Sequence, residues 1–164
     1  MQNSLWLNSI NQEKIVSYKR LKGGVSSEVY KVKTKNNYYC IKRCLNKLLV
    51  KKKWIVDVNR IAYEYLWLEH CNKILKKNIP HTYIYDEKNK YIVMEYFDNK
   101  NFSTLKQLYF RKKVSLNTIK SISKHLFKIH QDSKNLKIKK KFSGNKKNFF
   151  DLRLDAYFNE VGRV

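Results

Sequence analysis

The chain has 164 residues, 43% of them hydrophobic and 14% aromatic, which suits one domain or two small lobes with a packed core. This composition excludes wholesale disorder, and no apolar run approaches the roughly 20 residues that span a bilayer, so we expect no membrane partner. The formal net charge of +23 is typical of a protein with a polyanionic partner. An AT-rich genome would give the same excess of Lys, Asn, Ile, Tyr and Phe, and we favour that explanation because the lysines are scattered.

The N-terminus has no basic start followed by a long apolar stretch, so we expect no signal peptide. The three cysteines, Cys40, Cys44 and Cys71, are odd in number and widely spread, which indicates reduced thiols in a cytoplasmic protein. Cys40 and Cys44 lack the spacing of zinc ligands, and we predict no metal site from them.

Three strands are expected first, after a polar lead over residues 1–14 that could include one helical turn. Alternating apolar residues predict strands over 15–21, 28–34 and 38–43, with a turn at Asn36 and Asn37 between the last two. Three strands in about thirty residues indicate an antiparallel meander.

A helix comes next, because apolar residues recur at helical spacing after a capping residue, Asp57 or Asn59. Its expected inner face is Ile61, Tyr65, Leu68, Cys71 (or Asn72) and Leu75, and Pro80 marks its end. Two strands are expected over 81–86 and 90–97, then helices over 104–113 and 116–130, a basic loop over 137–148 and a helix over 149–161. The order predicts an α+β protein with a five-stranded antiparallel sheet and one inserted helix.

Four features, taken together and in their order along the chain, predict a nucleotide-binding site. Gly23, Gly24, Ser26 and Ser27 form a slim loop between two strands that could cover phosphate, although a hairpin with glycines at positive φ is the alternative. Lys42 on the third strand could reach phosphates, and Glu64 on the helix could pair with it. The backbone of Glu95, Tyr96 and Phe97, after an apolar strand, could bind a purine edge.

These segments resemble the aminoglycoside phosphotransferase-like small-molecule kinases, which are related to choline and methylthioribose kinases. The resemblance rests on "LKGGVSSEVYKV", "CIKRCLNKLLV", Trp54, "NRIAYEYLWL", "IPHTYIYDEKNKYIVMEYF" and "FFDLRLDAYF". It implies a protein-kinase-like fold, ATP and Mg²⁺ as cofactors, and a small-molecule acceptor with a hydroxyl group. It also implies that Lys42 contacts phosphate, that Glu64 orients Lys42, and that residues 95–97 hold adenine.

The family's catalytic loop, of the type H-G-D-x-x-x-x-N, is absent, and so is the second metal-binding Asp. "HQDSKN" over 130–135 is a poor substitute, because Asn135 follows Asp132 by three positions instead of five. We therefore expect a nucleotide-binding N-lobe over 1–97 and a truncated helical C-lobe over 98–164. We predict no catalytic or metal-binding residue in this chain. The resemblance implies that the metal ligands belong to a C-terminal half that is missing here.

Two other functions remain open at this point. A basic module that binds RNA or single strands would use Lys clusters between Tyr and Phe residues. An inactive pseudokinase scaffold is also compatible with the absent catalytic loop.

Overall fold

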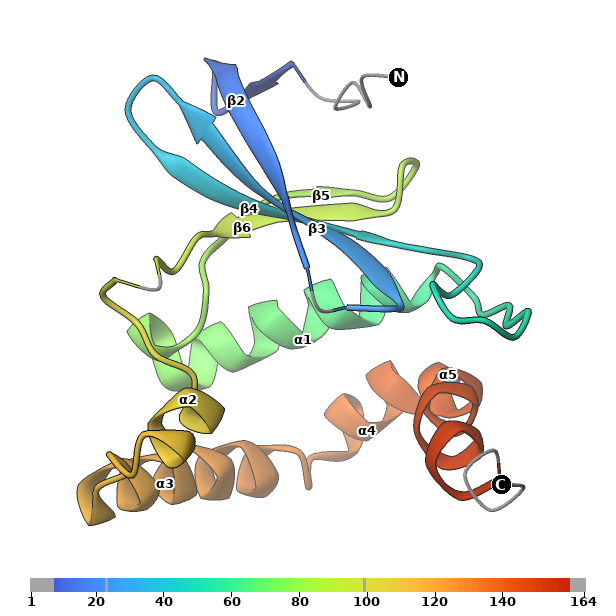
Figure 1. The fold of residues 1–164 in the computed structure, drawn as a ribbon. Helices are drawn as coiled ribbons and strands as arrows, with labels where there is room; N and C mark the ends of the chain where they lie inside the picture. The colour runs from blue at the N-terminus through green and yellow to red at the C-terminus, as the bar shows by residue number, and fades with distance from the viewer. Residues whose placement is uncertain (1–7, 23, 99, 160–164) are drawn as a thin grey trace.

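The structure is a computed structural model that describes residues 8–22, 24–98 and 100–159. Its main feature is a curled, six-stranded antiparallel sheet with strand order β1-β2-β3-β4-β6-β5 (Figure 1). The strands are β1 (Ser9–Ile10), β2 (Glu13–Leu21), β3 (Ser27–Thr34), β4 (Tyr38–Cys44), β5 (Thr82–Asp86) and β6 (Tyr91–Glu95). The α+β class and the β2–β3–β4 meander are thus as predicted.

The predicted number of five strands is wrong, because part of the N-terminal lead forms β1 and the start of β2. Ile10 pairs with Glu13, so Asn11 and Gln12 are the two residues of a tight turn. Both have positive φ, 48° and 66°, which suits the right-handed twist of paired strands and which Asn tolerates well. No glycine marks this turn, and the sequence reading therefore missed the hairpin.

The predicted helix is α1 (Arg60–Leu75), which ends at a short 3₁₀ turn, η1 (Lys76–Asn78), before Pro80. It covers one face of the sheet (Figure 1). Ile61, Cys71 and Leu75 are buried on its inner side. Asn59 is the N-cap residue, but its side chain makes no capping bond. The Asp57 carboxylate instead accepts a hydrogen bond from the Asn59 backbone N–H at 2.9 Å.

The sheet has two apolar faces. One face carries Tyr30, Val32, Tyr39, Ile41 and Val93 in a cluster enclosed by the curled strands. The other face carries Cys44 and Ile92, which pack with Ile61 of α1. Because side chains alternate along a strand, β4 supplies both clusters, and its residues Cys40, Lys42 and Cys44 lie on the α1 side.

The second part of the chain is helical: α2 (Leu105–Phe110), α3 (Leu116–Asp132), α4 (Leu136–Phe142), η2 (Ser143–Asn145), α5 (Lys146–Phe149) and the π-helix η3 (Phe150–Asn159). The predicted basic loop over 137–148 is wrong. Asn135 caps α4 by accepting the Lys137 N–H at 2.8 Å, and lysine is itself a good helix former. The last predicted helix is present up to Asn159; residues 160–161 lie outside the described residues. The division into lobes at residue 97 stays a prediction.

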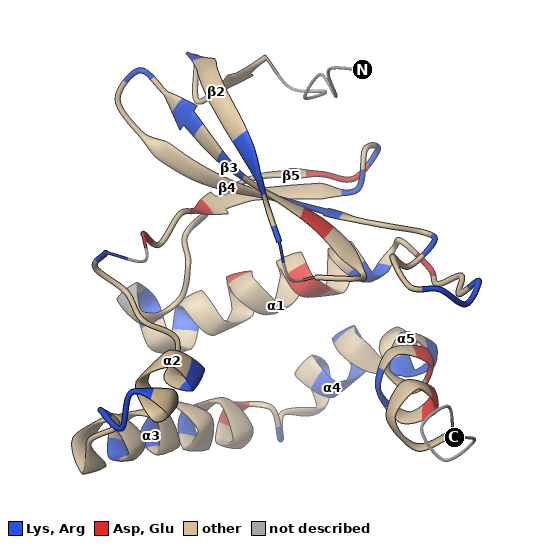
Figure 2. Ribbon diagram, viewed as in Figure 1, with Lys and Arg blue, Asp and Glu red and all other residues tan. Residues whose placement is uncertain are grey.

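Charge is spread over both parts of the molecule. Figure 2 shows Lys and Arg on strands, turns and every helical region, with acidic residues sparse among them. In the described part of the chain, no helix combines the length and the apolar character needed to cross a membrane.

Candidate nucleotide-binding site

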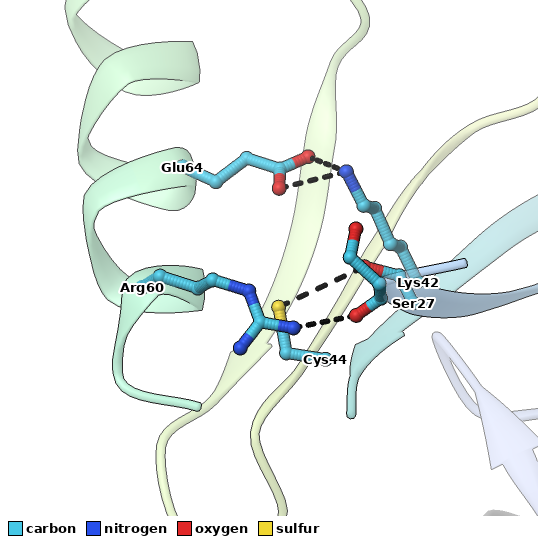
Figure 3. Close-up of polar contacts among 6 residues, drawn as sticks. Ser27, Lys42, Cys44, Arg60 and Glu64 are labelled. Atoms are coloured by element: carbon cyan, nitrogen blue, oxygen red, sulfur yellow. Dashed lines mark hydrogen bonds and ion pairs between the residues drawn. The ribbon is translucent and has the colours of Figure 1, made fainter. Parts of the chain in front are cut away.

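Lys42 and Glu64 form an ion pair between β4 and α1 (Figure 3). Lys42 Nζ lies 2.6 Å from Glu64 Oε1 and 2.8 Å from Oε2. The two side chains are 28% and 34% exposed, so water still reaches the pair. The predicted pairing is confirmed, whereas a role of the pair in nucleotide binding stays a prediction.

Cys40 shares the strand face of Lys42, two residues earlier. Burial raises the pKa of its thiol to about 11, an effect that Lys42 opposes and Glu64 reinforces through their charges. The thiol therefore stays protonated at neutral pH, and a protonated thiol is neither a nucleophile nor a metal ligand. This makes Cys40 a small apolar neighbour of the ion pair.

The loop between β2 and β3 is fixed by backbone hydrogen bonds from the segment that follows β4. The Val25 carbonyl accepts a hydrogen bond from the Leu49 N–H at 2.8 Å, and the Ser26 carbonyl accepts one from the Leu45 N–H at 3.1 Å. Ser27 begins β3, where its hydroxyl lies 3.9 Å from Cys44 Sγ and is buried. Ser26 and Ser27 are thus fixed beside Lys42.

Gly23 and Gly24 are the glycines of the predicted phosphate loop. Gly23 lies outside the described residues. Gly24 does not adopt positive φ, and a Cβ added there would lie 3.5 Å from the Ser27 carbonyl oxygen, an ordinary contact. The alternative of a turn glycine with positive φ is therefore wrong for Gly24.

Arg60 is a residue of the site that the sequence reading missed. It is the first residue of α1 and is only 9% exposed. Its guanidinium donates to the backbone carbonyls of Ser26, Leu45 and Asp57. Its position four residues before Glu64 puts both side chains on one helix face, and that spacing is the signal that could have revealed it.

The segment predicted to hold adenine lies at the other end of β4. Tyr39 pairs with Glu95 and Lys42 with Ile92, so three residue positions, about 10 Å, separate the two regions along the strand. The Glu95 N–H already donates to the His81 carbonyl at 2.8 Å. The Glu95 N–H is thus occupied, and a base would have to use the backbone of Tyr96 and Phe97, which follows β6.

Tyr96 is anchored by a cation–π arrangement on the sheet. Lys31 Nζ lies 4.3 Å from the ring centroid of Tyr38 and 4.4 Å from that of Tyr96. The ring of Phe97 packs against Phe102, with centroids 4.7 Å apart. These contacts fix the segment after β6.

A pocket of about 440 Å³ lies between the sheet, α1 and the C-terminal helices. Four of the predicted site residues line it: Ser26, Ser27, Lys42 and Glu64. Gly24 and residues 95–97 do not. Arg60 and Arg153 add positive charge to its wall, and Glu64 is the one carboxylate among its lining residues.

A larger pocket, of about 770 Å³, lies among α4, α5 and η3. It is lined mainly by apolar groups and two lysines and contains none of the predicted site residues. The smaller pocket is the better candidate because it holds the ion pair and the loop.

The site does not supply a ligand set for Mg²⁺. Both oxygens of Glu64 are bound by Lys42. Within residues 8–22, 24–98 and 100–159, no group of three or more His, Cys, Asp or Glu side chains could hold a metal ion.

No family model matches the chain, and no curated protein matches it. A crystal structure of a provisionally assigned fructosamine-3-kinase from Thermobifida fusca YX-ER1 is similar in part, with a TM-score of 0.39 and 14% sequence identity. The match covers 54% of this chain and 28% of that one. A likeness this distant carries no information on activity.

Proposed function

We propose that this chain binds ATP in the manner of the nucleotide lobe of a kinase-like phosphotransferase. The observation that carries the proposal is the Lys42–Glu64 ion pair in a pocket whose wall includes Ser26 and Ser27. The sequence resemblance to aminoglycoside phosphotransferase-like kinases supports ATP as the ligand.

Electrostatics favour a phosphate-bearing ligand. Glu64 holds the flexible Lys42 side chain in one extended position, which reduces the entropy lost when the ammonium binds an anion. The pocket wall carries three cationic side chains and one carboxylate, and the excess positive charge attracts anions. A nucleoside triphosphate would compensate this charge.

The arrangement also suits an elongated ligand. Phosphates at Lys42 and Ser27 would leave the base about 10 Å further along β4, beside the backbone of Tyr96 and Phe97. The face of β4 between these points carries the small, uncharged Cys40.

We propose binding without phosphoryl transfer for residues 1–164. Transfer to a hydroxyl of a small-molecule acceptor, which the resemblance implies, needs a positioned carboxylate and metal ligands. The sequence has no H-G-D-x-x-x-x-N motif, and the described residues offer no Mg²⁺ ligand set.

The test is ATP-dependent stabilisation of the protein and of its Lys42→Ala variant. ATP at about 100 times its Kd should raise the free energy of unfolding of the native chain by about 2.7 kcal/mol. Lys42→Ala should abolish most of this increase in urea or thermal unfolding.

The control is Lys19→Ala, which removes an exposed lysine of β2 and the same unit of charge. It should keep the full response to ATP. Equal responses of the native chain and Lys42→Ala would contradict the proposal, as would the absence of any response in the native chain.

A second candidate function rests on the charge of the helical part. Residues 100–149 contain fifteen Lys and Arg residues and a single acidic residue, Asp132. On α3, Lys120, Lys124 and Lys128 are exposed at helical spacing, next to the exposed Phe127. Such a surface could bind a single-stranded nucleic acid through phosphate contacts and stacking.

RNA titrations at several salt concentrations separate the two functions. If this surface binds RNA, replacing the three α3 lysines with Gln should lower the slope of log affinity against log salt by about 2. Lys42→Ala should then have no effect on RNA binding.

A further inference from the structure

We infer that Arg60 is a positioning residue that holds the phosphate-facing loop in its binding conformation and adds charge for the phosphate groups. This inference rests on the proposed ATP binding and assigns a specific part of it to a residue outside the Lys42–Glu64 pair.

The location of Arg60 needs a physical explanation. The N-terminus of a helix carries partial positive charge, which disfavours a cation in the first turn. Burial of an ionised side chain is also costly unless its donors are satisfied. Here the costs are offset by three backbone carbonyls, with Nη1 at 2.6 Å from the Asp57 oxygen and Nη2 at 2.8 Å from the Leu45 oxygen and bonded to Ser26.

These carbonyls come from three separate segments: the residues just before α1, the residue after β4 and the loop before β3. Arg60 therefore ties the loop to the two elements that carry Glu64 and Lys42. The Ser26 carbonyl accepts from both Arg60 and the Leu45 N–H, which fixes the plane of the peptide that joins Ser26 to Ser27.

The charge of Arg60 is not neutralised by its partners. All three acceptors are uncharged carbonyls, and no ion pair joins Arg60 to a carboxylate in the described part of the chain. The carboxylate of Glu64, one turn further along α1, forms its ion pair with Lys42. Arg60 lines the pocket, so its charge acts on an anion bound there.

An arginine is specifically required by this geometry. Its planar guanidinium presents several donors in fixed directions, whereas a lysine ammonium is a single point at the end of a flexible chain. We therefore expect Arg60→Lys to keep the charge and lose part of the loop's fixation, and Arg60→Gln to lose both.

The experiment measures the affinities of the full chain for ATP and for adenosine by calorimetry. Arg60→Gln should weaken ATP binding by at least about tenfold, because a charged hydrogen-bond donor is lost, and leave adenosine binding unchanged. Arg60→Lys should fall between native and Arg60→Gln. Arg111→Gln, an exposed arginine after α2, is the matched control for net charge and should bind ATP normally.

The outcomes separate this inference from the proposed function. Failure of the native chain to bind ATP would overturn both. Native-like ATP binding by Arg60→Gln, or equal losses for ATP and adenosine, would overturn the inference alone.

If circular dichroism shows that neither variant folds, NMR of the native chain tests whether Arg60 responds to bound ATP. The Arg60 side-chain N–H resonance should shift on addition of ATP and not on addition of adenosine. An unchanged resonance with ATP, in a chain that binds ATP, would overturn the inference.

Discussion

At the scale of single residues, the site is a balance of a few charges between one face of β4 and the facing side of α1. Lys42 and Glu64 neutralise each other, Arg60 remains without a carboxylate partner among the described residues, and Cys40 is held uncharged by burial. A thiol with a raised pKa links ionisation to stability, because the folded state keeps a proton that the unfolded state loses more readily.

We predict that the free energy of unfolding falls between pH 8 and pH 10, and that Cys40→Ala reduces this fall by about 1 kcal/mol. The folded thiol titrates near pH 11 and the unfolded thiol near its ordinary value of 9. The stabilisation is therefore complete below pH 9 and is lost as the pH rises towards 11. Urea unfolding of both proteins at the two pH values measures it, and equal pH dependence would contradict the role of Cys40.

At the scale of secondary structure elements, α1 is fixed by a narrow apolar contact with the sheet. Ile61 is fully buried and packs with Cys44 and Ile92, and Tyr65 stacks on Tyr85 with ring centroids 4.5 Å apart. This contact places α1 so that the carboxylate of Glu64 reaches the ammonium group of Lys42.

Replacing Ile61 by Ala should lower the free energy of unfolding by about 2 to 5 kcal/mol, because a buried side chain is lost and a cavity remains. The matched control is Ile119→Ala on α3, where the side chain is 43% exposed and the change should be within about 0.5 kcal/mol. Urea denaturation followed by circular dichroism measures both. Similar values for the two variants would show that α1 is not anchored through Ile61.

At the scale of the whole molecule, aromatic rings join α1 to the C-terminal helices. Phe142 of α4 lies near Tyr63, Trp67 and His70, with ring centroids 6.5, 5.3 and 6.4 Å away. His70 Nε2 also lies 2.8 Å from Asp132 Oδ2 at the end of α3. Phe142, Tyr63 and Trp67 also line the pocket, so these ring contacts form part of its wall.

Phe142→Ala should therefore destabilise the protein by about 1 to 3 kcal/mol and change the fluorescence of Trp67, since three ring contacts disappear. Phe127→Ala, which removes a phenylalanine that is 63% exposed on α3, is the control and should change neither property. Thermal unfolding and emission spectra test the pair of variants. Unchanged Trp67 emission in Phe142→Ala would indicate that α4 does not pack on α1.

Sequence by itself determined the features that depend on local pattern. The alternation along β4 put Lys42 and Cys40 on one face, and the helical spacing of Ile61, Cys71 and Leu75 defined the inner side of α1. The position of Glu64 early in the helix that follows the strand of Lys42 predicted the Lys42–Glu64 pair, which the structure contains.

Only the tertiary structure decided the features that depend on contacts between distant segments. Arg60 became part of the site because Ser26, Leu45 and Asp57 bring their carbonyls together, and backbone carbonyls leave no trace in residue type. The basic segment over 137–148 packs through Phe142 on aromatic rings of α1, a contact that its charge pattern did not indicate. The sequence specifies the side chains of each segment, but the free energy of packing depends on which other side chains they contact in the folded protein.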